Sequence, residues 1–273
     1  MLIYKEITQL VLNMDFIVLY KILTVPMVIV ITSLLVKKFG AFVGGIFAGL
    51  PLFSGPISFF ITLEQGTDFA RIAAYNSLIG LIGCAVTALL YAWVAYLGCK
   101  WWFALPSAVA GYFGVGYFFH YLPQFSFFVI ALACCTFAMG TLLLPRPKLE
   151  KYNTTRPHWL IWVQLLFGSL MVYSVTEAAA VLGPQWSGNM SCFPIMIVVI
   201  APFTHFANGV YTMIAVLRGF AAGWLGTSVF ACTVMLTVLH YHISFVYILA
   251  TVLSCASTVL YSLLLVHFRK KRK

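Results

Sequence analysis

Long apolar runs separated by short polar, glycine-rich or proline-rich turns make up nearly the whole chain. A run of roughly 20 apolar residues is long enough for an α-helix to cross a bilayer. The runs predict helices over residues 16–36, 41–62, 69–97, 101–119, 124–144, 159–182, 190–206, 210–239 and 243–267. The pattern therefore predicts an all-α protein, a polytopic transmembrane helical bundle with about nine spans.

Composition supports this class, since 63% of the 273 residues are hydrophobic and only 8% are charged. Soluble domains carry roughly 25% charged residues. The lipid bilayer is therefore the expected partner. The net charge of +10 does not indicate nucleic acid, because the basic residues sit in short groups beside the apolar runs. Lipid headgroups and membrane topology account for basic residues in such places.

The positions of the basic residues predict the orientation of the chain. With nine spans, one face of the membrane holds most of the sixteen lysines and arginines, at residues 37–38, 100, 146–156 and 269–273. The opposite face holds Lys5, Lys21 and Arg71. Because cytoplasmic loops carry the excess of positive charge, we expect the N-terminus outside and the C-terminus in the cytoplasm.

The two halves of the chain share landmarks at a constant spacing of 143 residues. The coinciding positions are Pro51 with Pro194, Gly66 with Gly209, Gly80 with Gly223, and Gly83 with Gly226. A shift of that length covers five predicted helices, so each element of the second copy crosses the membrane in the opposite direction. The prediction is an inverted repeat of four-helix units, residues 1–123 and 159–273, joined by a connecting helix and basic loop over 124–158.

Inverted repeats recur in secondary transporters, where interrupted helices at corresponding positions mark the binding site. The interrupted segments here carry Pro51, Ser54 and Pro56 in the first copy and Pro194 and Pro202 in the second. A proline break frees backbone groups, which together with Ser54 are predicted to face a substrate cavity. The alternative is a packing kink whose freed carbonyls are covered by neighbouring helices.

The first copy also carries a distinctive local pattern. It consists of AGLPLF at 48–53, followed by Glu64, Gly66, Asp68 and Arg71. This pattern resembles the GlpM-type (YdgC-type) family of small bacterial inner-membrane proteins. The resemblance covers about residues 20–120 and implies a four-span unit in the cell inner membrane, without a settled activity. The second copy departs from the pattern, with Ala207, Tyr211 and Ile214 where the charges would stand.

Two charged residues lie well inside predicted spans, where each needs a partner or a water-filled cavity. Arg218 presents a fork of donors that suits a carboxylate or phosphate, so we predict that it contacts an anionic substrate. Glu177 is predicted to couple the movement of a proton or cation, and Glu64 is a second coupling candidate. The alternative for Arg218 and Glu177 is a structural role, by reaching the nearest interface or pairing with a neighbour.

Other polar residues stand beside the interrupted segments or at the membrane surface. Asn76, His205 and Asn208 are candidates to line a cavity next to the broken helices. Two roles stay open for Asp68 and Arg71 at the outer surface. They could form a gate or entry site, or Thr67 or Asp68 could cap the third helix while Asp68 pairs with Arg71 in its first turn.

Glycines spaced four residues apart predict close helix packing. The pairs are Gly40 with Gly44, Gly45 with Gly49, and Gly219 with Gly223. Such pairs let two helix backbones approach each other.

The sequence contains no recognisable catalytic motif, so we expect no enzyme activity, no cofactor and no metal. Its seven cysteines mostly lie inside apolar runs and show no C-x-x-C spacing. This usage favours small core residues over a disulfide or metal framework. The adjacent Cys134 and Cys135 are the only pair with a redox alternative.

These features predict a secondary transporter, exporter or flippase with a site between the two interrupted helices. Its solute would be small and anionic or zwitterionic, with an amphipathic solute as one option. The alternative is a non-transporting inner-membrane accessory protein for envelope polysaccharide or secretion assembly, although the chain offers few loops for partner binding. The sequence leaves open the identity of the solute and whether the protein forms a homo-oligomer.

Overall fold

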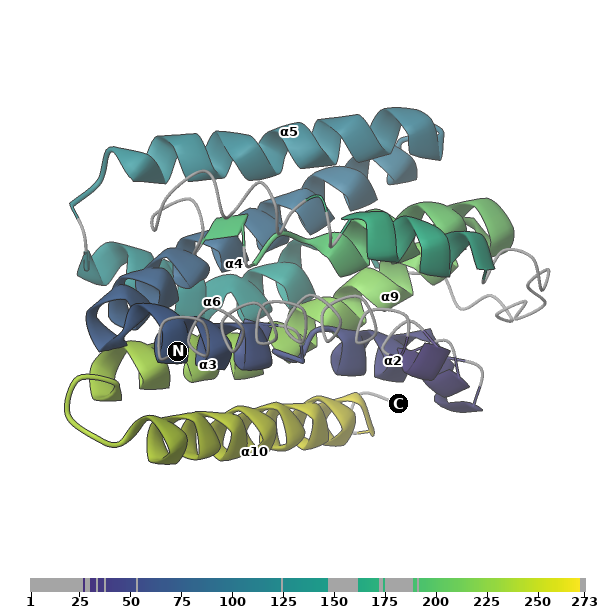
Figure 1. Ribbon diagram of the computed structural model, residues 1–273. Coiled ribbons are helices and arrows are strands. Elements are labelled where there is room, and N and C mark those ends of the chain that lie inside the picture. Colours follow the sequence, from purple (N-terminus) through teal and green to yellow (C-terminus); the bar gives the residue numbers. More distant parts are fainter. Residues whose placement is uncertain are drawn as a thin grey trace, which may run out of the picture.

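Figure 1 shows the computed structural model, which describes residues 27, 30–32, 34–36, 38–52, 54–123, 125–146, 162–171, 174, 189–190 and 192–270. Every regular element in this part of the chain is a helix. The elements are α2 (Ala41–Ala48), α3 (Ser54–Gln65), α4 (Thr67–Tyr96), α5 (Trp101–His120), α6 (Phe127–Leu143), α9 (Ile195–Thr237) and α10 (Ile243–Lys270). A shorter apolar helix covers Trp162–Met171.

Within the described residues, four helices are long and apolar enough to cross a membrane. They are α4, α5, α9 and the Ile243–Leu264 part of α10. The helix α6 and the helix Trp162–Met171 are apolar but shorter. The predicted all-helical, membrane-type fold is therefore confirmed at this level. The count of nine spans stays a prediction, because the predicted helices 16–36 and 159–182 fall largely outside the described residues.

The longest element, α9, consists of two helical segments that meet at Gly209. Gly209 has φ 83° and ψ 171°, and Gly66, between α3 and α4, has φ 86° and ψ 173°. This backbone region is essentially restricted to glycine. Both glycines are exposed, and a Cβ atom added to either would have no heavy atom within 4 Å. The backbone conformation, and not packing, therefore requires glycine at both turns.

The first proline break separates α2 from α3. The Leu52 N–H donates to the Leu50 carbonyl at 2.8 Å, which closes a three-residue turn around Pro51. Such a turn is an inverse γ-turn, and it redirects the chain out of the helix. The helix resumes where the Gly55 N–H donates to the Pro51 carbonyl at 3.0 Å. Pro56 lies in the first turn of α3, where the missing N–H of proline costs little.

The second break precedes α9 and repeats the same hydrogen bonds. The Ile195 N–H donates to the Phe193 carbonyl at 2.7 Å around Pro194, whose φ and ψ are −75° and 52°. The helix resumes where the Val198 N–H donates to the Pro194 carbonyl at 2.9 Å. Pro202 lies within the first segment of α9 (residues 195–208) and is buried. The two breaks thus share one local geometry.

Glycine pairs bring α2 into backbone contact with the second segment of α9 (residues 210–237). A Cβ atom on Gly45 would lie 2.8 Å from the Gly219 Cα. A Cβ atom on Gly223 would lie 2.7 Å from the Gly49 Cα. Real Cβ atoms do not approach backbone atoms so closely, so only glycine fits at this crossing. The small-residue packing predicted for these two pairs is confirmed.

The second segment of α9 lies at the centre of the bundle. The helices α2, α4, α6 and α10 all pack against α9, and α5 covers α4. Figure 1 shows α5 and α10 on opposite edges of the molecule, with α4, α6 and α9 between them. The chain folds back between α3 and α4 at Gly66. This arrangement buries the middle of α4 and α9 and leaves α5 and α10 with exposed apolar faces.

Enlarging a glycine at the α2–α9 crossing should destabilise the bundle. We expect Gly223→Ala to lower the free energy of unfolding by about 1–3 kcal/mol, because the added methyl group overpacks a backbone contact. Thermal unfolding in detergent, followed by tryptophan fluorescence, measures the change. The matched control is Gly114→Ala, since Gly114 is exposed in α5 with no atom near its Cβ position. Equal unfolding temperatures for the two variants would contradict the crossing.

Candidate functional site

The carbonyls at the two proline breaks are hydrogen-bonded from the opposite half of the chain. The Thr227 hydroxyl donates to the Gly49 carbonyl at 3.0 Å. The Cys84 thiol donates to the Cys192 carbonyl, also at 3.0 Å. Positions 84 and 227 differ by 143 residues, as do positions 49 and 192. At each break a carbonyl therefore accepts a hydrogen bond from the long helix of the other half, and the donor and acceptor residues occupy equivalent positions in the two halves.

Glycines repeat this reciprocal contact one turn earlier on each long helix. A Cβ atom on Gly80 would lie 3.0 Å from the Asn189 carbonyl oxygen. A Cβ atom on Gly223 would lie 2.7 Å from the Ile46 carbonyl oxygen. Gly80 is near the midpoint of α4, and Gly223 is near the midpoint of the second segment of α9. Both breaks therefore lie at mid-depth in the bundle, where transporter sites are found.

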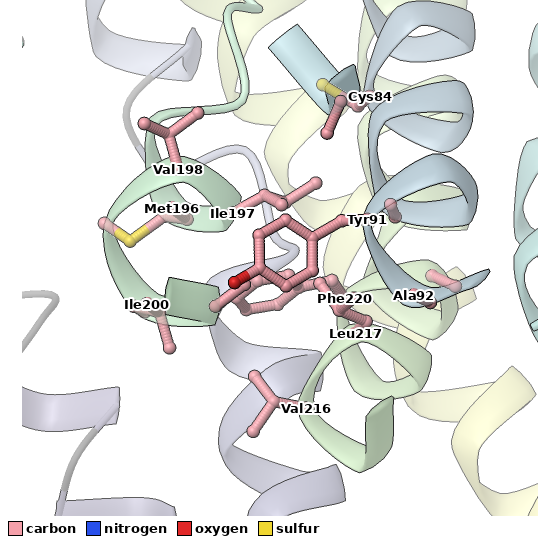
Figure 2. Packing of buried hydrophobic residues seen from close by; sticks show 14 of the residues in the cluster. Cys84, Tyr91, Ala92, Met196, Ile197, Val198, Ile200, Val216, Leu217 and Phe220 are labelled. Carbon is pink, nitrogen blue, oxygen red and sulfur yellow. The ribbon is translucent and has the colours of Figure 1, made fainter. Parts of the chain in front are cut away.

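One apolar cluster contains Tyr91 together with Ala48, beside the first break, and Phe193, at the second. Figure 2 shows the Tyr91 ring among Ile197, Leu217 and Phe220, with its hydroxyl directed toward the first segment of α9. Tyr91 is fully buried. Its hydroxyl oxygen lies 3.4 Å from Nδ1 of His205. This distance is long for a hydrogen bond, so the pair is a weak polar contact in apolar surroundings.

The predicted site residues are only partly brought together. His205 contacts Tyr91, as described, whereas Asn76 donates to the Ile72 carbonyl of its own helix at 2.9 Å. Ser54 begins α3 and is half-buried, and the Asn208 carbonyl accepts a hydrogen bond from Thr212 at 2.9 Å. The four prolines occupy the breaks or the half-helices, as reported above. In this conformation the break carbonyls of Gly49 and Cys192 are covered, as the packing-kink alternative requires.

Arg218 belongs to the second segment of α9, and its side chain reaches the C-terminal end of α6. Its guanidinium donates to the Thr141 carbonyl at 2.7 Å and to the Leu144 carbonyl at 2.9 Å. The last carbonyls of a helix lack partners within the helix and carry the negative end of its dipole. Arg218 supplies both hydrogen bonds and positive charge there. The Trp93 indole N–H donates to the neighbouring Leu143 carbonyl at 3.0 Å.

The remaining charged candidates are at the surface or outside the described residues. Asp68 is exposed in the first turn of α4, but the cap residue of this helix is Gly66, and no side chain caps it. The expected side-chain cap on this helix is therefore wrong. The Arg71 guanidinium lies 4.5 Å from the Phe125 ring centre. Glu177 and the side chain of Glu64 lie outside the described part of the structure.

Sequence reasoning missed Thr227, Cys84 and Gln164. The 143-residue spacing between Thr227 and Cys84 was a usable signal, since both follow a glycine of the repeat by four residues. Gln164 is 1% exposed, and neither its amide nitrogen nor its oxygen has a hydrogen-bond partner among the residues that the structure describes. No local pattern indicates such burial. An unpartnered amide in an apolar interior is costly.

Comparisons of the chain with protein-family models, curated proteins and solved structures find no match. The resemblance of residues 20–120 to the GlpM-type family therefore stays a prediction. The function has to be inferred from the geometry of the bundle.

Removing the Arg218 guanidinium should destabilise the end of α6. We expect Arg218→Ala to lower the free energy of unfolding by about 1.5–3 kcal/mol, since hydrogen bonds from a charged group are lost. Arg218→Lys should restore only part of the loss, because lysine lacks the planar fork. The control is Arg71→Ala, which removes an exposed cation–π contact with an expected loss of about 1 kcal/mol or less. An unfolding temperature of Arg218→Ala equal to that of the parent protein would rule out this cap.

Replacing the buried amide of Gln164 by an apolar side chain of similar length should stabilise the protein. We expect Gln164→Met to raise the free energy of unfolding by about 1–3 kcal/mol, the penalty of an unsatisfied buried polar group. Gln164→Glu should lower it, because an acid is harder to bury than an amide. Thermal unfolding in detergent measures both. A lower stability for Gln164→Met would mean that the amide has a partner.

Proposed function

We propose that the chain is a multi-pass membrane transporter that moves a small anionic or zwitterionic solute by alternating access between its two proline-broken helices. The observation that carries the proposal is the repetition, 143 residues apart, of one backbone geometry. Pro51 and Pro194 have the same turn hydrogen bonds, and Gly66 and Gly209 have the same φ and ψ angles within 3°. This repetition extends to the reciprocal hydrogen bonds of Thr227 and Cys84.

The contacts support an inverted arrangement of the two copies. Cys84 in α4 contacts Cys192, just before the first segment of α9, and further along both helices Tyr91 contacts His205, so α4 and this segment run in parallel. The helices α2 and α3 likewise run parallel to the second segment of α9, since their contacts advance together along both. Because α3 and α4 fold back on each other, α3 and its counterpart in α9 run in opposite directions. Inverted repeats of this kind recur in secondary transporters.

The half-helices support the proposed preference for a negatively charged group. The helix α3 begins at Ser54, and the first segment of α9 begins at Ile195. Both starts lie beside the mid-depth breaks, and the N-terminal end of a helix carries partial positive charge. In transporters built from inverted repeats, such half-helix N-termini point at anionic substrate groups. Arg218 and Glu177 remain the proposed anion contact and coupling residue.

The two turn glycines suggest how access alternates. Each half-helix extends from a mid-depth break to a turn glycine, α3 to Gly66 and the first segment of α9 to Gly209. In an inverted repeat these two turns lie at opposite membrane surfaces. A swing of α3 about Gly66 would open one side, and the equivalent movement about Gly209 would open the other. Either movement breaks one of the two reciprocal hydrogen bonds and leaves the other intact.

Flux through reconstituted vesicles tests transport. Purified protein is screened by thermal shift against anionic and zwitterionic solutes, and a solute that raises the unfolding temperature is then followed, radiolabelled, into proteoliposomes. We expect uptake above that of protein-free vesicles, and a loss of about tenfold, equivalent to about 1.4 kcal/mol in the barrier, for Gly209→Ala. Gly114→Ala, which leaves the turn untouched, should transport normally. If no solute is taken up, the transporter proposal fails and the accessory-protein alternative gains.

Two further measurements separate the parts of the proposal. Normal flux in both Arg218→Ala and Glu177→Gln would reject the assigned site but not transport. Cysteine labelling tests the inversion, using Cys99 in the loop after α4 and Tyr241→Cys in the loop after α9. An impermeant maleimide should label the Tyr241→Cys position in intact cells and reach Cys99 only after permeabilisation. Labelling of both from the same side would contradict the inverted repeat.

A further inference from the structure

Two cysteines that are far apart in the sequence face each other in the bundle. The sulfur atoms of Cys134, in α6, and Cys232, in the second segment of α9, are 3.9 Å apart. Both side chains are half-buried. The adjacent Cys135 is exposed on a different side of α6. The thiol pair is therefore formed by two helices and not by the neighbouring cysteines of one helix.

The backbone around the thiol pair is fixed on both helices. The Ser228 hydroxyl donates to the Ala133 carbonyl at 3.0 Å, directly beside the pair. Further along the same contact, a Cβ atom on Gly140 would lie 3.4 Å from the Cα of Ala221. The helices thus run antiparallel in close contact on the Gly140 side of the thiols. A disulfide requires the two sulfur atoms to approach to about 2.05 Å, so the side chains must rotate from their present spacing of 3.9 Å.

The thiol pair lies among partly buried apolar residues, about two helical turns or less from the start of α6 and the end of α9. Cys232 is five residues before the end of α9 at Thr237, or about 7.5 Å along the helix axis. Cys134 is seven residues after the start of α6 at Phe127, or about 10 Å. Leu236, one helical turn after Cys232, is 66% exposed, so the surface beside the thiol pair is apolar. An oxidant that dissolves in lipid therefore reaches the thiols directly, whereas a water-soluble one must cross the headgroup layer.

We propose that Cys134 and Cys232 form an oxidisable dithiol, whose oxidant is a lipid-soluble quinone. In the reaction the two S–H bonds break and one S–S bond forms. The two electrons and two protons released reduce the quinone to the hydroquinone. The resulting disulfide links α6 to the second segment of α9. The proposal does not depend on transport, because it concerns only the packing of these two helices.

Thiol counting in the full-length protein tests the proposal. Protein in lipid nanodiscs is incubated with decylubiquinone, denatured, and labelled with a maleimide-polyethylene glycol that adds mass to every free thiol. The seven cysteines of the chain should give five labelled thiols after oxidation and seven after reduction with dithiothreitol. Mass spectrometry of the digested protein should recover a peptide pair joined through Cys134 and Cys232. Hydroquinone should appear in equal amount, measured by its absorbance.

Serine variants supply the controls. Cys134→Ser and Cys232→Ser should abolish the quinone-dependent loss of two thiols, whereas Cys135→Ser, one residue away, should keep it. Oxidation by diamide but not by decylubiquinone would overturn the quinone as oxidant. A bond through Cys135, or no loss of thiols with either reagent, would overturn the dithiol itself. Unfolding temperatures of the serine variants near that of the parent protein establish that they are folded.

Discussion

A backbone carbonyl left without its helical donor inside a lipid bilayer must find another donor within the protein, and this requirement shapes the whole bundle. The chain interrupts two helices at proline, and each interruption occurs at mid-depth. The donors come from Thr227 and Cys84, which stand on the long helices of the opposite halves. The two halves are thereby hydrogen-bonded to each other at both breaks.

The same requirement explains why the centre of the bundle is so tightly packed. Hydroxyl and thiol groups have a short reach, so a donor on one helix serves a carbonyl on another only if the two backbones nearly touch. Glycine at positions 49, 80 and 223 permits that approach. The connecting helix α6 follows the same rule, since its final carbonyls are satisfied by Trp93 from one half and Arg218 from the other.

Much of this fold could be predicted from local signals. Apolar length located the helices α4, α5, α6 and α10 within a few residues of their observed ends, and proline located both breaks. Contacts between residues that are far apart in the sequence could not be predicted, because no local pattern indicates them. No local signal indicated that Arg218 would donate to the carbonyls of Thr141 and Leu144 at the end of α6. Asp68 looked like a cap, but the glycine-only backbone at Gly66 begins the helix without one. The partner of Cys134 proved to be Cys232, 98 residues later, and not its sequence neighbour.

The cap on α6 has a consequence for the symmetry of the molecule. Under the proposed inverted repeat, a pair of separate chains, each a four-helix unit inserted in the opposite sense to the other, would possess the central crossing and both hydrogen-bonded breaks. It would have no connecting helix, and so no acceptors for Trp93 and Arg218. The single chain therefore contains a contact, Trp93 and Arg218 on the end of α6, that such a symmetric pair of subunits could not form. Because Trp93 and Arg218 donate different groups to the end of α6, the two halves differ in their side-chain contacts, although their backbones at the breaks are nearly the same.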